Sequence, residues 1–300
     1  MVVTCLFRSV VPPGIVEMAM QPLIEIASLG VPVYLVPGNH ERSRIPLHLW
    51  ASHPDIHIFD RPKTFHLQVR DRSITISGFP YVRDIRNCFP SVVKETGHEP
   101  GATDSAILCM HQAFEGARVG EPGKFRFRNG RDVVRGLDLP NGLDAVFTGH
   151  IYHAQILRAD TQGRPLAAPV IYPGLVERTS WAEQDEPKGY VIITVGEGRD
   201  QPEMQWTRLP ARPMCDVYAD SAPERQSLEV SLATELRKLQ RDAVVRLHLR
   251  GAWSDGAREA LASANLRRLA ADTMNISLHR GAMSSQPRRE GPAVPVEKQG

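Results

Sequence analysis

Cysteine is scarce in this 300-residue chain, and its four copies lack the spacing of a zinc site or a disulfide framework. Cys5, Cys88, Cys109 and Cys215 contain no Cys-x-x-Cys pair, and two of them lie in apolar runs typical of strands. Disulfides persist in oxidising compartments, and nothing in this pattern suggests one. We therefore expect reduced thiols in a cytoplasmic protein.

A strong net charge and a long apolar run are also missing. The formal charge of +2 gives no general attraction to nucleic acid, so a DNA contact would need a local basic patch. No apolar run is long enough to cross a membrane, and no signal peptide is recognisable. With 42% apolar and 23% charged residues, the composition is that of a soluble globular protein.

The most informative stretch is an apolar run that ends in a tight turn. Residues 33–36 are rich in β-branched and aromatic side chains, which predicts a buried parallel strand. Pro37 and Gly38 force a turn, and Asn39 and His40 follow directly. Open α/β folds bind their ligands at the carboxyl ends of such strands.

Two later apolar runs end in the same manner. Residues 106–110 lead into His111, and residues 144–149 lead into His150. One histidine after a strand can be a structural residue with a hydrogen bond, and Gly-Asn-His alone can be only a turn. Three such strand ends in one chain indicate a metal site, because imidazole and carboxamide groups suit a manganese- or zinc-like ion.

These motifs are similar to those of a known family. Gly-Asn-His-Glu at 38–41, the segment 110–116 and Thr-Gly-His at 148–150 resemble the calcineurin-like metallophosphoesterases, and within them the DNA-repair exonuclease branch of SbcD-type nucleases. The resemblance implies an α/β fold: a metallophosphoesterase-type two-sheet sandwich flanked by helices, with a small C-terminal α+β capping domain. It places the phosphoesterase domain, incomplete at its N-terminus, at 1–209, the capping domain at 210–280 and a disordered tail at 281–300.

The resemblance also implies the chemistry. Family members use two metal ions, often manganese, to activate a water molecule and hold a phosphodiester. Asn39, His111 and His150 would belong to one metal site. His40 would donate a proton to the leaving oxygen as the catalytic acid, and Glu41 would orient His40. DNA and an SMC-like ATPase subunit are the partners implied.

The sequence departs from the family pattern at the other metal site. The N-terminal Asp-x-His strand is absent, and Cys5 stands where the bridging aspartate belongs. Tyr152 takes the second histidine position of Gly-His-x-His, and His153 comes one residue late. Since one residue redirects a side chain to the other face, we expect His153 to be a neighbour rather than a ligand. At most one divalent ion, manganese, is expected.

Two functions remain open at this point. The first is a metal-dependent phosphodiesterase of the DNA-repair exonuclease type with impaired catalysis. The second is a non-catalytic pseudo-enzyme subunit that binds DNA or a partner. A wrongly chosen start codon, which would hide the first strand, is a further alternative.

Two basic features invite a functional and a structural interpretation. One segment interleaves basic and aromatic residues, which suits a phosphate backbone and stacked bases but also fits a solvated basic hairpin: Arg118, Lys124, Phe125, Arg126, Phe127, Arg128 and Arg131. Arg178, in a stretch resembling the family's Tyr-Pro-Gly-Ser, could contact substrate phosphate or form an ion pair with Glu183 or Glu186.

The remaining pattern predicts the elements around the site. We expect a helix over 14–29 with a kink at Pro22, a strand at 56–59 and a hairpin of 65–69 with 74–79. Long loops are expected at 84–103 and 116–142, and a second sheet from 155–157, 169–174, 189–195 and 204–209. A β-α-β-α-β unit over 216–278 would form the second domain.

Overall fold

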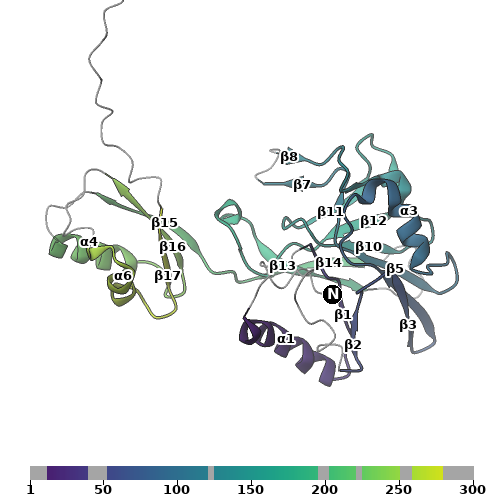
Figure 1. Ribbon diagram of the computed structural model, residues 1–300, viewed down its shortest axis with the longest axis horizontal. Coiled ribbons are helices and arrows are strands. Elements are labelled where there is room, and N and C mark those ends of the chain that lie inside the picture. The colour runs from purple at the N-terminus through teal and green to yellow at the C-terminus, as the bar shows by residue number, and fades with distance from the viewer. Residues whose placement is uncertain are drawn as a thin grey trace, which may run out of the picture. The chain divides into compact units, whose positions relative to one another are not determined.

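The computed structural model describes residues 12–39, 53–120, 125–194, 203–220, 225–250 and 259–279 (Figure 1). Cys5, His40 and Glu41, and the predicted tail at 281–300, lie outside the described residues. Contacts within the chain divide it into two compact units, residues 1–211 and 212–300, and each is treated by itself below. Within the described parts, no helix is long and apolar enough to cross a membrane.

The first unit contains most of the secondary structure. Its helices are α1 (Pro13–Ser28), α3 (Ile85–Glu95) and two short 3-10 turns, η1 (Gly136–Asp138) and η2 (Trp181–Glu183). Its strands are β1 (Val33–Leu35), β2 (Ile56–Ile58), β3 (Lys63–Val69), β4 (Arg72–Gly78), β5 (Ser105–Met110), β6 (Ala113–Phe114), β7 (Arg118–Val119), β8 (Phe125–Arg126), β9 (Val133–Val134), β10 (Ala145–Thr148), β11 (Gln155–Ala159), β12 (Pro165–Tyr172), β13 (Lys188–Thr194) and β14 (Glu203–Leu209).

A six-stranded sheet forms the centre of this unit, in the order β11-β12-β10-β5-β4-β3. Its four inner strands are parallel, and its two edge strands pair antiparallel. This arrangement confirms the α/β class. The predicted second sheet is wrong in part, because β11 and β12 join the central sheet while β13 and β14 pair with each other. The hydrophobic pattern of the sequence predicted where these strands lie in the chain but not which strands pair with each other.

The predicted loop at 84–103 is also wrong, because α3 occupies residues 85–95. Pro90 inside this helix suggested a loop. The apolar residues Ile85, Phe89, Val92 and Val93 nevertheless follow helical spacing, and all four are buried. Their burial against the sheet outweighs the cost of the proline.

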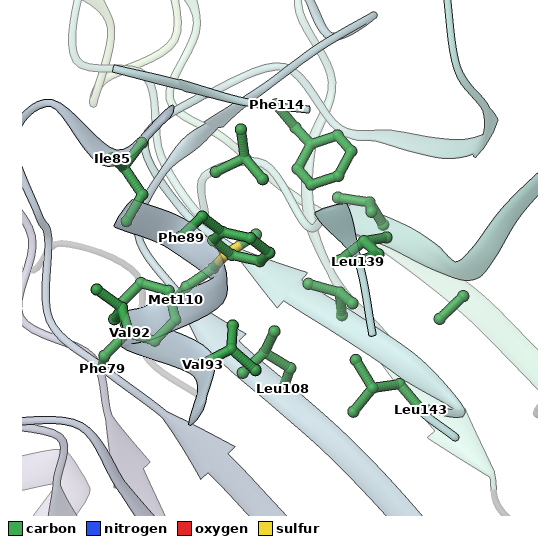
Figure 2. Packing of buried hydrophobic residues seen from close by; sticks show 14 of the residues in the cluster. Phe79, Ile85, Phe89, Val92, Val93, Leu108, Met110, Phe114, Leu139 and Leu143 are labelled. Carbon is green, nitrogen blue, oxygen red and sulfur yellow. The ribbon is translucent and has the colours of Figure 1, made fainter. Parts of the chain in front are cut away.

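Hydrophobic residues cover both faces of the central sheet. Figure 2 shows Phe89 and Val93 of α3 lying over Leu108 and Met110 of β5 on one face. The alternate residue Cys109 faces a second cluster, which contains residues of β1 and its surroundings. Burial raises the pKa of the Cys109 thiol to about 12, so this cysteine is an inert core residue. The sheet is thus buried on both sides, as parallel strands require.

An apolar cavity of about 730 Å³ lies on the second face of the sheet. Tyr34 of β1 and Val191 of β13 both line it, and the central sheet contributes Ile76, Ile107 and Phe147. β1 pairs only with β2, and β13 only with β14, so each has one unpaired edge among the described residues. Residues of β1, β13 and the central sheet therefore border one apolar space.

The second unit has the expected β-α-β-α-β order. It consists of β15 (Met214–Asp220), α4 (Arg225–Arg237), β16 (Val244–Arg250), α6 (Ser263–Leu269) and β17 (Asn275–Leu278). The three strands are parallel and adjacent. The two helices cover one face of this sheet. Leu228, Leu232 and Leu266 of the helices pack there with Val245 and Leu247 of β16.

A charged network crosses the other face of this small sheet. Asp216 on β15 accepts hydrogen bonds from Arg246 at 2.6 and 2.8 Å and lies 2.6 Å from His248 Nε2. These bonds, the one from Arg246 first, lower the pKa of Asp216 to about 2. The carboxylate therefore ties β15 to β16 by a bidentate pair.

We expect Asp216→Asn to lower the free energy of unfolding of this unit at pH 7 by about 1–2 kcal/mol, since the carboxylate is largely shielded but not fully buried. Because the folded-state pKa is lowered, the contribution is complete above the unfolded-state value near 4 and is lost as the pH falls through about 2. Urea unfolding of the wild type and of Asp216→Asn between pH 7 and pH 2 should show free energies of unfolding that converge as the pH approaches 2. A constant difference at all pH values would contradict this assignment.

Candidate functional site

The candidate site forms where three strands end. β5 and β10 are adjacent and parallel, with Met110 in register with Thr148, so His111 and His150 leave the sheet at the same edge. The backbone N–H of Gly149 donates to the Met110 carbonyl at 3.1 Å and holds this edge together. Asn39 reaches it from the turn after β1.

The structure brings the three described side chains of the predicted metal site together. His111 Nε2 lies 3.1 Å from Asn39 Oδ1, and the rings of His111 and His150 have centroids 5.4 Å apart. His111 is almost completely buried, at 2% exposure, whereas His150 is half-buried. Their convergence is what the strand-end pattern in the sequence predicted; a metal role remains a prediction.

Tyr81 is a fourth member that the sequence reasoning missed. Its ring centroid lies 6.3 Å from that of His111 and 5.9 Å from that of His150. It follows β4, the neighbour of β5, and its N–H donates to the Pro37 carbonyl at 2.9 Å. The signal was available: Phe79-Pro80-Tyr81 ends an apolar strand, as the other site segments do.

A buried network fixes the backbone around the site. Thr148 Oγ1 accepts from the Gln112 N–H at 3.0 Å and donates to the Gln112 carbonyl at 2.9 Å. The Tyr172 hydroxyl donates to the same carbonyl at 2.9 Å, and burial raises the pKa of this phenol. All three residues are at most 1% exposed. Because His111 adjoins Gln112, this network limits where its imidazole can lie.

His150 has a strained backbone. Its φ is +76°, in the left-handed region that residues with a Cβ rarely adopt. Such strain costs on the order of 1–3 kcal/mol and persists where the surrounding structure imposes it. Here the hydrogen bond of Gly149 at the sheet edge imposes the positive φ of His150. The backbone therefore leaves the strand direction at this residue, and the imidazole is directed toward His111.

The donor set fits one metal ion of intermediate hardness. Asn39 can offer an amide oxygen, and His111 and His150 can offer imidazole nitrogens, which suit zinc- or manganese-like ions. The part of the chain that the structure describes contains no group of three or more His, Cys, Asp and Glu residues that could hold a metal. The site thus has nitrogen and neutral oxygen donors but no described carboxylate to bridge two ions.

Tyr152 and His153, the two other described residues considered as metal ligands, lie in the segment after His150. His153 Nδ1 lies 3.4 Å from Glu186 Oε1, and Tyr152 is half-buried. His153 thus has a carboxylate partner, and its role as a neighbour rather than a ligand stays a prediction. His153 is 38% exposed on its side chain, unlike the nearly buried His111.

Arg178 is held by the segment that follows β12. Its Nε donates to the backbone carbonyl of Glu183 at 3.1 Å, and its N–H donates to Glu177 Oε1 at 2.8 Å. The carboxylate of Glu183 pairs with Lys188 and accepts hydrogen bonds from Thr179 and Ser180. Arg178 therefore has a backbone carbonyl among its partners, and both the ion pair and the contact with substrate phosphate stay predictions.

Comparison with known proteins agrees with this geometry. No curated protein matched the sequence. The family model of the calcineurin-like phosphoesterases matches residues 8–154, a segment that includes Asn39, Tyr81, His111 and His150. Divalent metals are the cofactors of such phosphoesterases. The strands that end at the site lie within the matched segment, and residues 8–154 thus resemble a calcineurin-like phosphoesterase domain.

Proposed function

We propose that this chain is a metal-dependent phosphodiesterase of the DNA-repair exonuclease type whose catalysis is impaired because it holds one metal ion instead of two. The observation that carries the proposal is the cluster of Asn39, His111 and His150, which offers three donors to one ion and no described carboxylate to a second. By resemblance to the family, DNA is the substrate and an SMC-like ATPase is a partner.

Each residue of the cluster has a part in this proposal. Asn39, His111 and His150 hold one manganese ion, and Tyr81 packs beside both imidazoles and limits the access of water. When bound, the ion supplies positive charge to the phosphoryl oxygens and lowers the pKa of water. His40, placed directly after Asn39 in the sequence, donates a proton to the leaving oxygen.

The cavity on the second face of the sheet bears on the second metal site. In the family that the sequence resembles, an N-terminal strand carries the Asp-x-His ligands of the other metal. Tyr34 of β1 and Val191 of β13 line an apolar space of about 730 Å³, which the described residues do not fill. A strand of that kind would find apolar walls and backbone partners in this space.

The proposal predicts very low activity for the purified 300-residue chain. In manganese, hydrolysis of bis-p-nitrophenyl phosphate and of linear DNA should be hardly above background, because general acid catalysis alone contributes about a hundred- to ten-thousandfold. The residual activity should disappear in His111→Ala and on chelation. Turnover at ordinary enzyme rates, roughly 1–1,000 per second, together with its loss in His40→Ala, would contradict the impairment.

A non-catalytic subunit that binds DNA or a partner is the second candidate. The same shortage of carboxylates favours it. The two candidates differ in one result: the first retains a small manganese-dependent rate that His111→Ala removes, whereas the second shows no rate that responds to manganese or to this substitution.

A further inference from the structure

We propose that a basic pocket beside the metal site binds the phosphate backbone of a single DNA strand. The inference rests on the proposed function for its choice of DNA. The pocket has a volume of about 380 Å³, and three arginines and a histidine line it: Arg118, Arg126, Arg158 and His153. Gly116, Gln155 and the backbone of β11 complete its walls.

The pocket is formed by a hairpin that is fastened to the central sheet. β7 and β8 pair antiparallel, and the side chain of Gln155 at the start of β11 binds the backbone of this hairpin. Gln155 Oε1 accepts from the Arg118 N–H at 2.9 Å, and Gln155 Nε2 donates to the Arg118 carbonyl at 2.8 Å. Arg126 Nε donates to the Gly116 carbonyl at 3.3 Å. The predicted loop at 116–142 is therefore wrong in its described part, which contains β7, β8 and β9, and Arg118 and Arg126 occupy defined positions.

The charges in this pocket are not balanced within the described residues. Arg118 and Arg126 are direct cross-strand partners, an arrangement that like charges make unfavourable. Arg158 adds a third guanidinium from the neighbouring strand. In the described part of the chain, none of these three arginines has a carboxylate within ion-pair distance, whereas Arg131, Arg135 and Arg164 each do.

Two described carboxylates that adjoin or contact residues of the pocket have other partners. Glu115, next to Gly116, accepts a hydrogen bond from Thr161, and Glu186 pairs with Lys188 and His153. An anion would relieve the repulsion between Arg118 and Arg126, and a phosphate diester accepts hydrogen bonds from two guanidinium groups at once. The imbalance thus favours a phosphate ligand.

The position of the pocket favours a polymer over a small phosphate ester. His153 follows His150 by three residues, so a fully extended chain separates their Cα atoms by at most about 11 Å. A strand with one phosphate at the metal site could therefore place another in the pocket.

An aromatic side chain favours a single strand over a duplex. Phe125, next to Arg126 on β8, is 56% exposed, and Phe127 meets it edge-on with ring centroids 5.0 Å apart. Phe127 packs against the hydrophobic core, so it holds the exposed ring in place. An unpaired base can stack on such a ring, whereas bases within a duplex cannot.

The test measures binding, independent of catalysis. Fluorescence anisotropy with a labelled 20-nucleotide oligo(dT) is recorded in EDTA at several salt concentrations, with the full-length chain. Arg118→Ala/Arg126→Ala should weaken binding on the order of tenfold at 50 mM salt and reduce the salt slope by about 1.4, at roughly 0.7 for each lost phosphate contact. Phe125→Ala should weaken oligo(dT) binding roughly five- to hundredfold and leave duplex binding unchanged.

A matched variant controls for charge alone. Arg61→Ala/Arg208→Ala removes the same charge from two exposed arginines that do not line the pocket, and its affinity should stay within about twofold of wild type. Thermal unfolding of each variant checks the fold, and Arg158→Ala supplies a second pocket variant outside the hairpin. An equal loss in pocket and control variants, no loss in the pocket variants, or an equal effect of Phe125→Ala on duplex DNA would overturn the proposal. A chain with no activity that still passes this test would refute only the catalytic proposal.

Discussion

Restoring the second metal site is expected to raise the phosphodiesterase rate by several orders of magnitude. The variant carries an added N-terminal strand with Asp-x-His, together with Cys5→Asp and Tyr152→His. Two-metal hydrolysis uses both ions to neutralise charge on the transferred phosphoryl group, and each 1.4 kcal/mol of added stabilisation is worth about tenfold in rate. The measurement is kcat/KM for bis-p-nitrophenyl phosphate in manganese, compared with the unmodified chain.

Partial variants separate the contributions in this experiment. The point substitutions without the strand should gain little, because the Asp-x-His ligands are still missing. His111→Ala in the restored protein should return the rate to background, since it removes a donor of the first site. A restored protein that binds two ions but stays inactive would show that the defect does not lie in the metal site.

Loss of the buried lysine should cause the largest fall in stability. The Lys188 side chain is completely buried, and its Nζ pairs with Glu183 and, at 3.3 Å, with Glu186. Lys188→Met would leave two largely buried carboxylates facing each other with no cation between them. We expect the free energy of unfolding to fall by about 3–5 kcal/mol, a decrease in Tm on the order of 10 °C.

A surface lysine in the same unit provides the control. Lys63 pairs with Asp60, whose side chain is 58% exposed, so Lys63→Met should cost less than about 1 kcal/mol. Differential scanning calorimetry of the two variants compares them directly. Equal, small shifts would contradict the assignment of Lys188 as the cation that stabilises the segment between β12 and β13.

Periodicity and turn chemistry in the sequence were sufficient for much of the fold and for the core of the site. Apolar runs closed by Gly and His located β1, β5 and β10, and parallel strands ending at one edge placed Asn39, His111 and His150 together. The alternation of β3 and β4 predicted their hairpin. These signals are local, since the residues that carry them lie within a few positions of one another.

What the sequence did not reveal depends on contacts between distant segments. α3 was not predicted because Pro90 argued against a helix, although its apolar residues have helical spacing. Their burial in the hydrophobic core with residues from several strands stabilises the helix. Tyr81 ends an apolar strand, but the end of one strand does not show which strands lie beside it, and Tyr81 joins the site because β4 neighbours β5. The basic pocket likewise requires Arg158 to lie beside a hairpin some forty residues earlier in the chain.

Calorimetric titration with manganese tests the single-site proposal most directly. The 300-residue chain should bind at most one ion, weakly, because the described donors include no carboxylate. His111→Ala should bind none, since its imidazole is a donor at the centre of the cluster, and His153→Ala should bind as wild type does. Two ions per chain with micromolar affinity or better would contradict the proposal, as would a complete loss of binding in His153→Ala.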